Sequence, residues 1–168
     1  TGPEPAAPAI ARADIDGDPE SVELSFEPTV ATGVAVNATH MYWANTEAGT
    51  IERALIEGDG DPEVFVEGLE NPQYVALDAT HVYWSATGEL DGEGKPQDGL
   101  GTIGRAEIGL TEGEEVDEDF ITGANNPQGV AVNATHVYWA NGGRLSGGGA
   151  EAVATRTIGR AVLGATEA

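Results

Sequence analysis

The chain has 168 residues, with 7 Lys and Arg against 29 Asp and Glu, and its formal net charge at pH 7 is -22. A surface of this charge repels nucleic acid phosphates and anionic lipids, so we expect no nucleic-acid partner. No run of about 18 apolar residues is present, so we expect no membrane insertion. The lack of cysteine excludes disulfides and thiol chemistry.

The chain begins with TGPEPAAP, residues 1–8, which we interpret as a Pro- and Ala-rich spacer. Residues 9–32 contain the blocks AIARADI at 9–15 and SVELSFE at 21–27, separated by DGDPE. Asp, Gly and Pro in this order are typical of a turn. The segment is therefore predicted to form two opening strands.

Residues 33–73 contain four short strand-like blocks. GVAV and HMYWA are rich in β-branched and aromatic residues, and the NATH sequence that joins them is typical of a tight turn. TIERALI at 50–56 alternates along its length, and PEVFVEG follows at 62–68. No segment has a convincing helical period, so this unit is predicted to be a sheet of four strands.

The unit recurs in residues 74–128 and again, without its fourth block, in residues 129–168. The first two blocks return as YVALDATHVYWSA and GVAVNATHVYWAN, the third as TIGRAEI and TIGRAVL, and the fourth once as DEDFITG. A repeat of 41 to about 55 residues with four strands is typical of a β-propeller blade. We therefore predict an all-β fold with residues 9–168 forming a partial propeller of about three blades, at 33–73, 74–128 and 129–168.

These motifs resemble the YWTD repeats of the β-propellers of low-density-lipoprotein-receptor type. The matching residues are Tyr42-Trp43-Ala44-Asn45, Tyr83-Trp84-Ser85-Ala86 and Tyr138-Trp139-Ala140-Asn141, followed by Ile51-Glu52-Arg53-Ala54, Ile103-Gly104-Arg105-Ala106 and Ile158-Gly159-Arg160-Ala161. The resemblance implies a six-bladed propeller that usually binds partners and is not usually an enzyme. The Asp of the family motif is Asn, Ala and Asn here, so no role of that Asp is carried over.

In strand order the chain has the third and fourth strands of a blade, two complete blades, and three strands of another. This is about half of a six-bladed ring. One strand, of the kind that comes third in a blade, is left over. Two chains could close one ring, the chain could be part of a longer repeat protein, or it could stack into an open fibre. We favour the ring of two chains, which makes the protein a homo-oligomer.

His40, His81 and His136 occupy the same position in the three repeats. A catalytic histidine needs a unique environment and a partner that orients it. We therefore interpret all three as structural, with each ring bonded to a backbone group at its turn. A shared metal would require the three rings to converge near the axis, from which the second strand lies away.

Trp43, Trp84 and Trp139 each follow a tyrosine, so the two rings point to opposite faces of the strand. We expect both rings to fill the interfaces between blades. The recurring arginines Arg53, Arg105 and Arg160, together with Arg12, are expected to pair with carboxylates or backbone oxygens and to connect neighbouring blades.

Two acidic turns resemble the start of a calcium loop: Asp14, Asp16 and Asp18 in the first, and Asp59 and Asp61 in the second. The first has Ser25 where a calcium loop places its bidentate Glu. We favour a role as turns only. Calcium is the one cation that we consider as a ligand of these turns, and we expect no other cofactor. The NAT sequences at 37–39 and 133–135 match a glycosylation acceptor, but Asp78 in the middle repeat favours a turn requirement.

Two connections between second and third strands are long, at 85–102 and 140–157, whereas the first repeat has only ANTEAGT there. Long loops on a rigid scaffold often carry binding residues, although the insertions could also be merely tolerated. We expect a binding face at these loops and at the nearby starts of the first strands. Its candidate residues are Gln73, Tyr74, Gln128, Glu89, Asp91, Lys95 and Arg144.

Three functions fit this pattern. The favoured one is a non-enzymatic module, extracellular or at the cell surface, that self-associates through blade edges and presents its loop-rich face to a protein or glycan. The second is a self-assembling fibre or appendage subunit. The third is an enzyme of propeller lactonase or lyase type, for which the sequence offers no unique histidine and no Gly-x-Ser-x-Gly motif.

Overall fold

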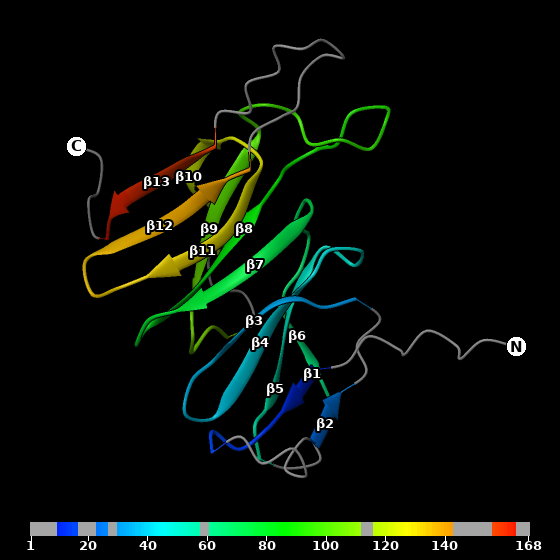
Figure 1. Cartoon of the computed structure of the whole chain (residues 1–168), viewed down its shortest axis with the longest axis vertical. Helices are drawn as coiled ribbons and strands as arrows, with labels where there is room; N and C mark the ends of the chain where they lie inside the picture. Colours follow the sequence, from blue (N-terminus) through cyan, green and yellow to red (C-terminus); the bar gives the residue numbers. More distant parts are fainter. Residues whose placement is uncertain are drawn as a thin grey trace, which may run out of the picture.

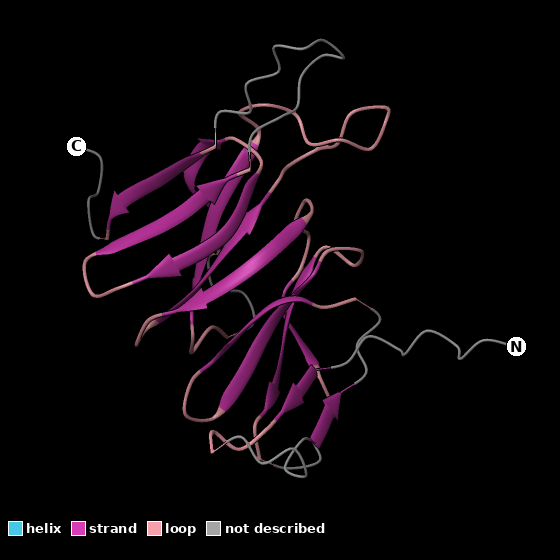
Figure 2. Cartoon of the chain, in the orientation of Figure 1, coloured by secondary structure: helices cyan, strands magenta, loops and turns pink. Residues whose placement is uncertain are grey.

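The computed structural model describes residues 10–16, 23–26, 30–57, 61–111, 116–142 and 156–163. Within these ranges every regular element is a β-strand, and four antiparallel sheets follow one another along the chain (Figures 1 and 2). The prediction of an all-β propeller-type fold is confirmed. Over the part of the chain that the structure describes, no helix has the length and apolar character needed to cross a membrane.

The opening sheet pairs two short strands, and the first blade follows it with four. The opening sheet contains β1 (Ile10–Arg12) and β2 (Glu23–Phe26). The first blade contains β3 (Thr32–Val36), β4 (His40–Asn45), β5 (Thr50–Leu55) and β6 (Glu63–Val66), each paired with the next.

The second blade again has four strands, and the third has three among the described residues. The second contains β7 (Pro72–Leu77), β8 (His81–Ala86), β9 (Gly101–Glu107) and β10 (Asp117–Ala124). The third contains β11 (Pro127–Val132), β12 (His136–Asn141) and β13 (Thr157–Val162). The strand sequence read from the repeats is the one observed.

The first strands of the three blades lie next to one another. β7 is flanked by β3 on one side and by β11 on the other, and the remaining strands of each blade extend away from this row (Figure 1). A first strand at the centre and a fourth at the periphery is the arrangement of propeller blades.

Alternation along the second strand builds the core between the blades. Trp43 packs with Ile10 on the side of the opening sheet, whereas Tyr42 packs with Val82 and Trp84 of the second blade. In the same way Trp84 faces the first blade, and Tyr83 packs with Val137 of the third. In the first two blades the Tyr-Trp pair therefore joins its blade to both neighbours.

The turn between the first and second strands is built around one side chain. Asn37 Oδ1 accepts the backbone N–H groups of Thr39 at 2.9 Å and His40 at 2.8 Å, and Asn133 makes the same contacts with Thr135 and His136. Asn and Asp commonly close turns in this way. The NAT sequences are thus accounted for as turns.

A second asparagine position needs an unusual backbone. Asn71 and Asn126 have φ of 55° and 47°, the left-handed region that Asn tolerates better than most residues. Each precedes the Pro-Gln that begins a first strand. Asn71 Nδ2 donates to the carbonyl of Gly88 at 2.9 Å, so this residue also anchors the long loop of the second blade.

Candidate functional site

The three histidine rings make the same contact in each blade. Nδ1 of His40, His81 and His136 lies 2.8 Å from the hydroxyl of the preceding threonine. The expectation that each ring bonds a backbone group is therefore wrong, because the threonine hydroxyl occupies the ring nitrogen and the backbone N–H bonds the turn residue instead. The three rings lie at separate turns, because they begin the second strands of three different sheets, β4, β8 and β12.

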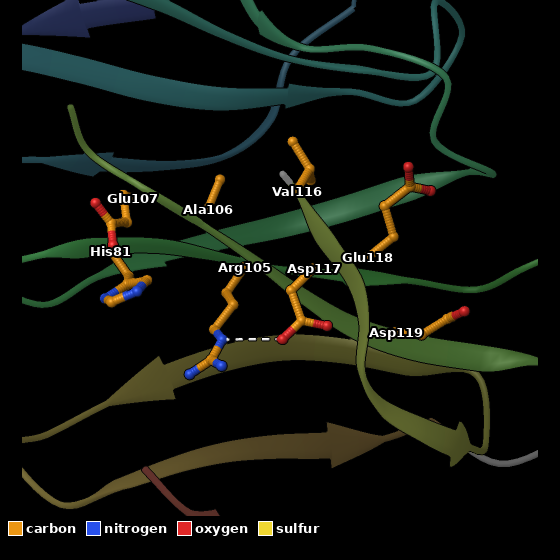
Figure 3. A pocket seen from close by; sticks show the side chains of 8 residues that line it. All are labelled: His81, Arg105, Ala106, Glu107, Val116, Asp117, Glu118 and Asp119. Atoms are coloured by element: carbon orange, nitrogen blue, oxygen red, sulfur yellow. Dashed lines mark hydrogen bonds and ion pairs between the residues drawn. The ribbon is translucent and has the colours of Figure 1, made fainter. Parts of the chain in front are cut away.

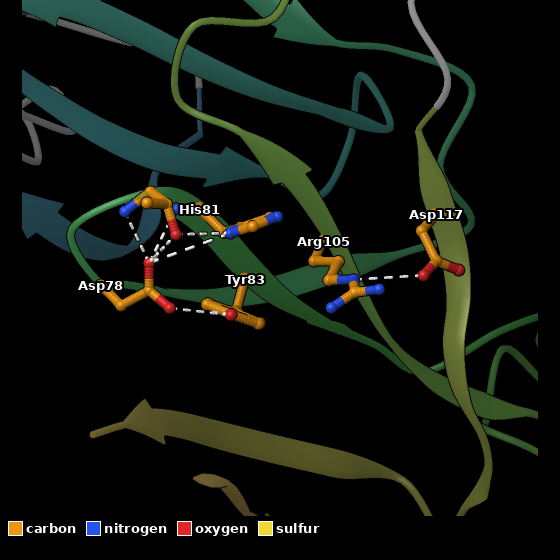
Figure 4. A network of polar contacts seen from close by, with 6 residues as sticks. Asp78, His81, Tyr83, Arg105 and Asp117 are labelled. Atoms are coloured by element: carbon orange, nitrogen blue, oxygen red, sulfur yellow. Dashed lines mark hydrogen bonds and ion pairs between the residues drawn. The ribbon is translucent and has the colours of Figure 1, made fainter. Parts of the chain in front are cut away.

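Asp78 gives the second blade a charged version of this turn (Figure 4). Its Oδ1 accepts hydrogen bonds from the backbone N–H groups of Thr80 and His81, at 2.7 and 2.8 Å, and its Oδ2 accepts one from the Tyr83 hydroxyl at 2.9 Å. Burial raises the pKa of Asp78, but these hydrogen bonds outweigh it and hold the pKa below 3.8. Burial and the neighbouring carboxylate raise the pKa of Tyr83 well above 10.0.

A broad pocket of about 790 Å³ lies beside this turn, where β8 begins, β9 ends and β10 begins (Figure 3). It is lined by His81, Arg105, Ala106, Glu107, Val116, Asp117, Glu118 and Asp119. One arginine among four carboxylates gives the pocket a negative balance. It suits a cationic or hydroxyl-bearing group better than an anion.

Arg105 is held in place inside this pocket. Its Nε lies 3.2 Å from Asp117 Oδ2 (Figures 3 and 4). Its guanidinium stacks 3.9 Å from the ring centroid of Phe120. Paired and stacked in this way, Arg105 orders the pocket wall.

The equivalent arginines of the preceding sheets reach the next blade. Arg53 pairs with Glu63 at 2.6 Å and donates to the carbonyl of Ile108 in the second blade at 3.4 Å. Arg12 contacts the carbonyl of Ile56 and the carboxylate of Glu57 in the first blade. Arg160 on β13 is exposed.

The long loop of the second blade is a small ordered structure. It spans residues 87–100 and projects beyond the sheet (green in Figure 1). Leu90 and Pro96 form an isolated antiparallel β-bridge. Asp91 Oδ1 accepts hydrogen bonds from the backbone N–H groups of Glu93 and Lys95, at 2.9 and 3.0 Å. Lys95 pairs with Glu93 at the tip, and Glu89 is exposed beside Leu90.

The candidate residues at the starts of the first strands lie apart from the loop tip. Gln73 donates to the carbonyl of Asn71 at 3.3 Å, and Gln128 donates to Asn126 Oδ1 at 3.0 Å. Tyr74 packs against Gly33, where a Cβ would come within 2.9 Å of the tyrosine ring. These side chains thus support the strand starts, and of the three only Tyr74 is exposed, at 38%.

The acidic turns are only partly covered by the structure. Asp14, Asp16 and Asp61 are exposed in turns or loops, whereas Asp18, Asp59 and Arg144 lie outside the described residues. Among the residues described, no group of three or more acidic or histidine side chains is arranged to hold a metal ion.

From the sequence, Asp78 was interpreted only as a turn residue, because it replaces an asparagine of the other repeats. Asp117, Glu118 and Asp119 were not expected to form a site. The three carboxylates of β10 give no such signal, since their position depends on an irregular strand pairing. Asp117 pairs with Arg105 and Ile121 with Ile103, so three residues bulge opposite Gly104 alone.

Comparison with known proteins shows the fold. The chain is similar to one chain of a solved structure described as the crystal structure of a nidogen/laminin complex, with a TM-score of 0.63 and 22% sequence identity. The match covers 82% of this chain and 51% of the other, so this chain spans about half the length of the one it resembles. The match shows a β-propeller fold. No protein-family model and no curated protein sequence matches the chain.

Proposed function

We propose that this chain is a non-enzymatic propeller module, extracellular or at the cell surface, that binds a basic protein partner through the loop of residues 87–100. The observation that carries the proposal is the loop itself. It is fixed at its base by Asn71, closed by its own hydrogen bonds and still projects from the blade. A loop ordered before binding loses less conformational entropy when a partner docks.

The chemistry of the loop indicates the kind of partner. Leu90 and Leu100 are 40% and 46% exposed, and the same loop carries the exposed carboxylates of Glu89, Glu93 and Asp98. A loop that offers both apolar and acidic side chains is complemented by a surface with apolar residues and Lys or Arg. The similar solved chain comes from a structure of a complex between two proteins, which agrees with a binding role.

Lys95 allows a direct test, because it is the only lysine of the chain and lies at the loop tip. The chain is labelled with a photo-crosslinker at Lys95 and mixed with the secreted proteins of the source organism. The Lys95→Arg variant, treated in the same way, is the matched control. We expect a basic partner joined at Lys95. The purified partner should then bind at least about tenfold more weakly when residues 87–100 are replaced by Thr-Glu-Ala, the short connection of the first blade.

The proposal fails if the purified partner binds the shortened variant as tightly as the original chain. Circular dichroism of the variant serves as the folding control. The first blade already connects the same two strands with this short sequence, so the variant is expected to fold.

The exposed face of β13 supports a second role, in which the third blade packs against a further blade. Ile158 is 73% exposed, whereas its equivalents Ile51 and Ile103 are 0% exposed because each faces the next blade. We propose that another blade of this type packs on β13, supplied by a second copy when the 168-residue chain is alone.

A further inference from the structure

The opening sheet packs on the first blade in the way that each blade packs on the next. Ile10 of β1 belongs to one core cluster with Met41, Trp43 and Ala54 of the first blade. The same set recurs at both later interfaces: Ile51 with Val82, Trp84 and Ala106, and Ile103 with Val137, Trp139 and Ala161. β1 therefore occupies the position that the third strand of a preceding blade would take.

Arg12 repeats the arginine contact of this strand. Arg12 Nη1 donates to the carbonyl of Ile56 at 3.3 Å, and Arg53 Nη1 donates to the carbonyl of Ile108 at 3.4 Å. Ile56 and Ile108 hold the same place in their blades, since each donates its N–H to the carbonyl of the threonine before the histidine. Two side chains of β1 thus contact the first blade as their equivalents in β5 contact the second.

The first strand of the first blade lacks the cover that this strand has in the second blade. Val34 and Val36 are 56% and 62% exposed. They pair with Trp43 and Met41 across β3 and β4, so all four side chains lie on one side of the sheet. Val75, the equivalent of Val34, is only 7% exposed, because β3 lies against β7. The two described strands of the opening sheet therefore cover only part of this side.

The complementary surface lies at the other end of the molecule (Figure 1). We call Val34, Val36, Met41, Trp43 and Ala54 the N-terminal face of the first blade. The third blade has a first, a second and a third strand, and its Ile158 is 73% exposed. β3 lies against β7, and β7 lies against β11, so a third blade placed before the first would put β11 against β3. The two ends of the chain are thus the two halves of the interface that joins its blades.

We propose that the third blade of a second copy docks on the N-terminal face of the first blade, and that β1 leaves this face when it does. β11 of the second copy covers Val34 and Val36, and Ile158 takes the place of Ile10. Both isoleucines begin an Ile-x-Arg-Ala block, and one position cannot hold both. The opening sheet and the second copy therefore compete for one surface. This inference rests on the proposed association through β13 and specifies the surface that β13 meets.

β1 is held weakly enough to be displaced. It has three residues, and only Ile10 is buried. The ion pair of Arg12 with Glu57 is exposed on both sides and contributes little to stability. Docking of the third blade replaces one buried isoleucine by another and also removes Val34 and Val36 from water. The exchange therefore buries more apolar surface than it exposes.

A contact between two different faces can be tested by mixing variants that are each blocked at one end. Val34→Glu places a charge on the N-terminal face, and Ile158→Glu places one on β13. We expect each variant alone to be a monomer by light scattering. An equimolar mixture should give the mass of two chains, because each variant supplies the face that the other lacks. Leu55→Glu is the control and should associate as the original chain does. Circular dichroism checks that all variants fold.

Ile10→Glu tests the competition with β1. A charge at this buried position should release β1 and tighten association about tenfold, measured by light scattering across a dilution series. Ile10→Glu combined with Ile158→Glu should be a monomer. This double variant separates docking of the third blade from non-specific association of an exposed apolar face.

The proposal is overturned if the mixture of Val34→Glu and Ile158→Glu stays monomeric, because a second copy would then not be the occupant of the N-terminal face. It is also overturned if Ile10→Glu leaves association unchanged or weakens it. If Ile158→Glu lowers the mass and Val34→Glu does not, β13 still mediates association but meets a different surface. That result separates failure of this inference from failure of the proposed role of β13.

Discussion

The indole nitrogen of Trp43 donates a 2.8 Å hydrogen bond to Glu52 across strands β4 and β5. Neither of the other blades repeats this contact, since Gly104 and Gly159 stand opposite Trp84 and Trp139. The repeats thus share one strand pattern but differ in the polar chemistry buried beside the tryptophan. That difference leads to the predictions on the first two blades.

Replacing Glu52 with Ala should destabilise the protein by about 1–3 kcal/mol, because the donors on Trp43, Asn45 and Thr50 lose a shared acceptor. Glu52→Gln keeps an oxygen in the same place and should cost less. Chemical denaturation measures both free energies of unfolding. Equal losses for the two variants would show that the acceptor oxygen is not what matters.

Gly104→Ala should cost about 1–3 kcal/mol, because the added methyl meets the Trp84 ring at less than 3.0 Å. Gly129→Ala is the matched control, since a Cβ there meets nothing within 4 Å and the backbone has no positive φ. Thermal unfolding should separate the two variants clearly. A Gly104→Ala protein as stable as the control would mean that the indole moves aside freely.

The Tyr-Trp alternation and the four-strand unit were predictable from the sequence because both depend on short-range periodicity, and the repeats present it three times. The contact of Trp84 with Gly104 was not predicted, since it depends on which residues face each other across β8 and β9. The replacement of Glu52 by Gly104 was nevertheless visible when the repeats are aligned. The bulge of β10 had no comparable signal, because strand register is decided by packing and not by composition.

The charged turn of the second blade should make stability depend on pH in the acid range. The pKa of Asp78 lies below 3.8 in the folded chain, so its contribution is fully present above the unfolded value and is lost as the pH falls through the folded value. Asp78→Asn, which installs the residue of the other two turns, should remove this contribution. The difference in unfolding free energy between the two proteins should shrink as the pH is lowered from neutral to pH 3. A constant difference across that range would contradict the assignment to Asp78.

Association through β13 is the last prediction. Ile158 is exposed where Ile51 and Ile103 are covered by a following blade, so the isolated 168-residue chain should self-associate through this face. Light scattering should give a mass above that of one chain, and Ile158→Glu should lower it because a charge at the interface must be desolvated. Leu55→Glu is the control, since Leu55 is an exposed apolar residue at the end of β5, on another blade. The control should leave the mass unchanged. A monomer at micromolar concentration, or equal masses for the original chain and Ile158→Glu, would show that β13 does not mediate association.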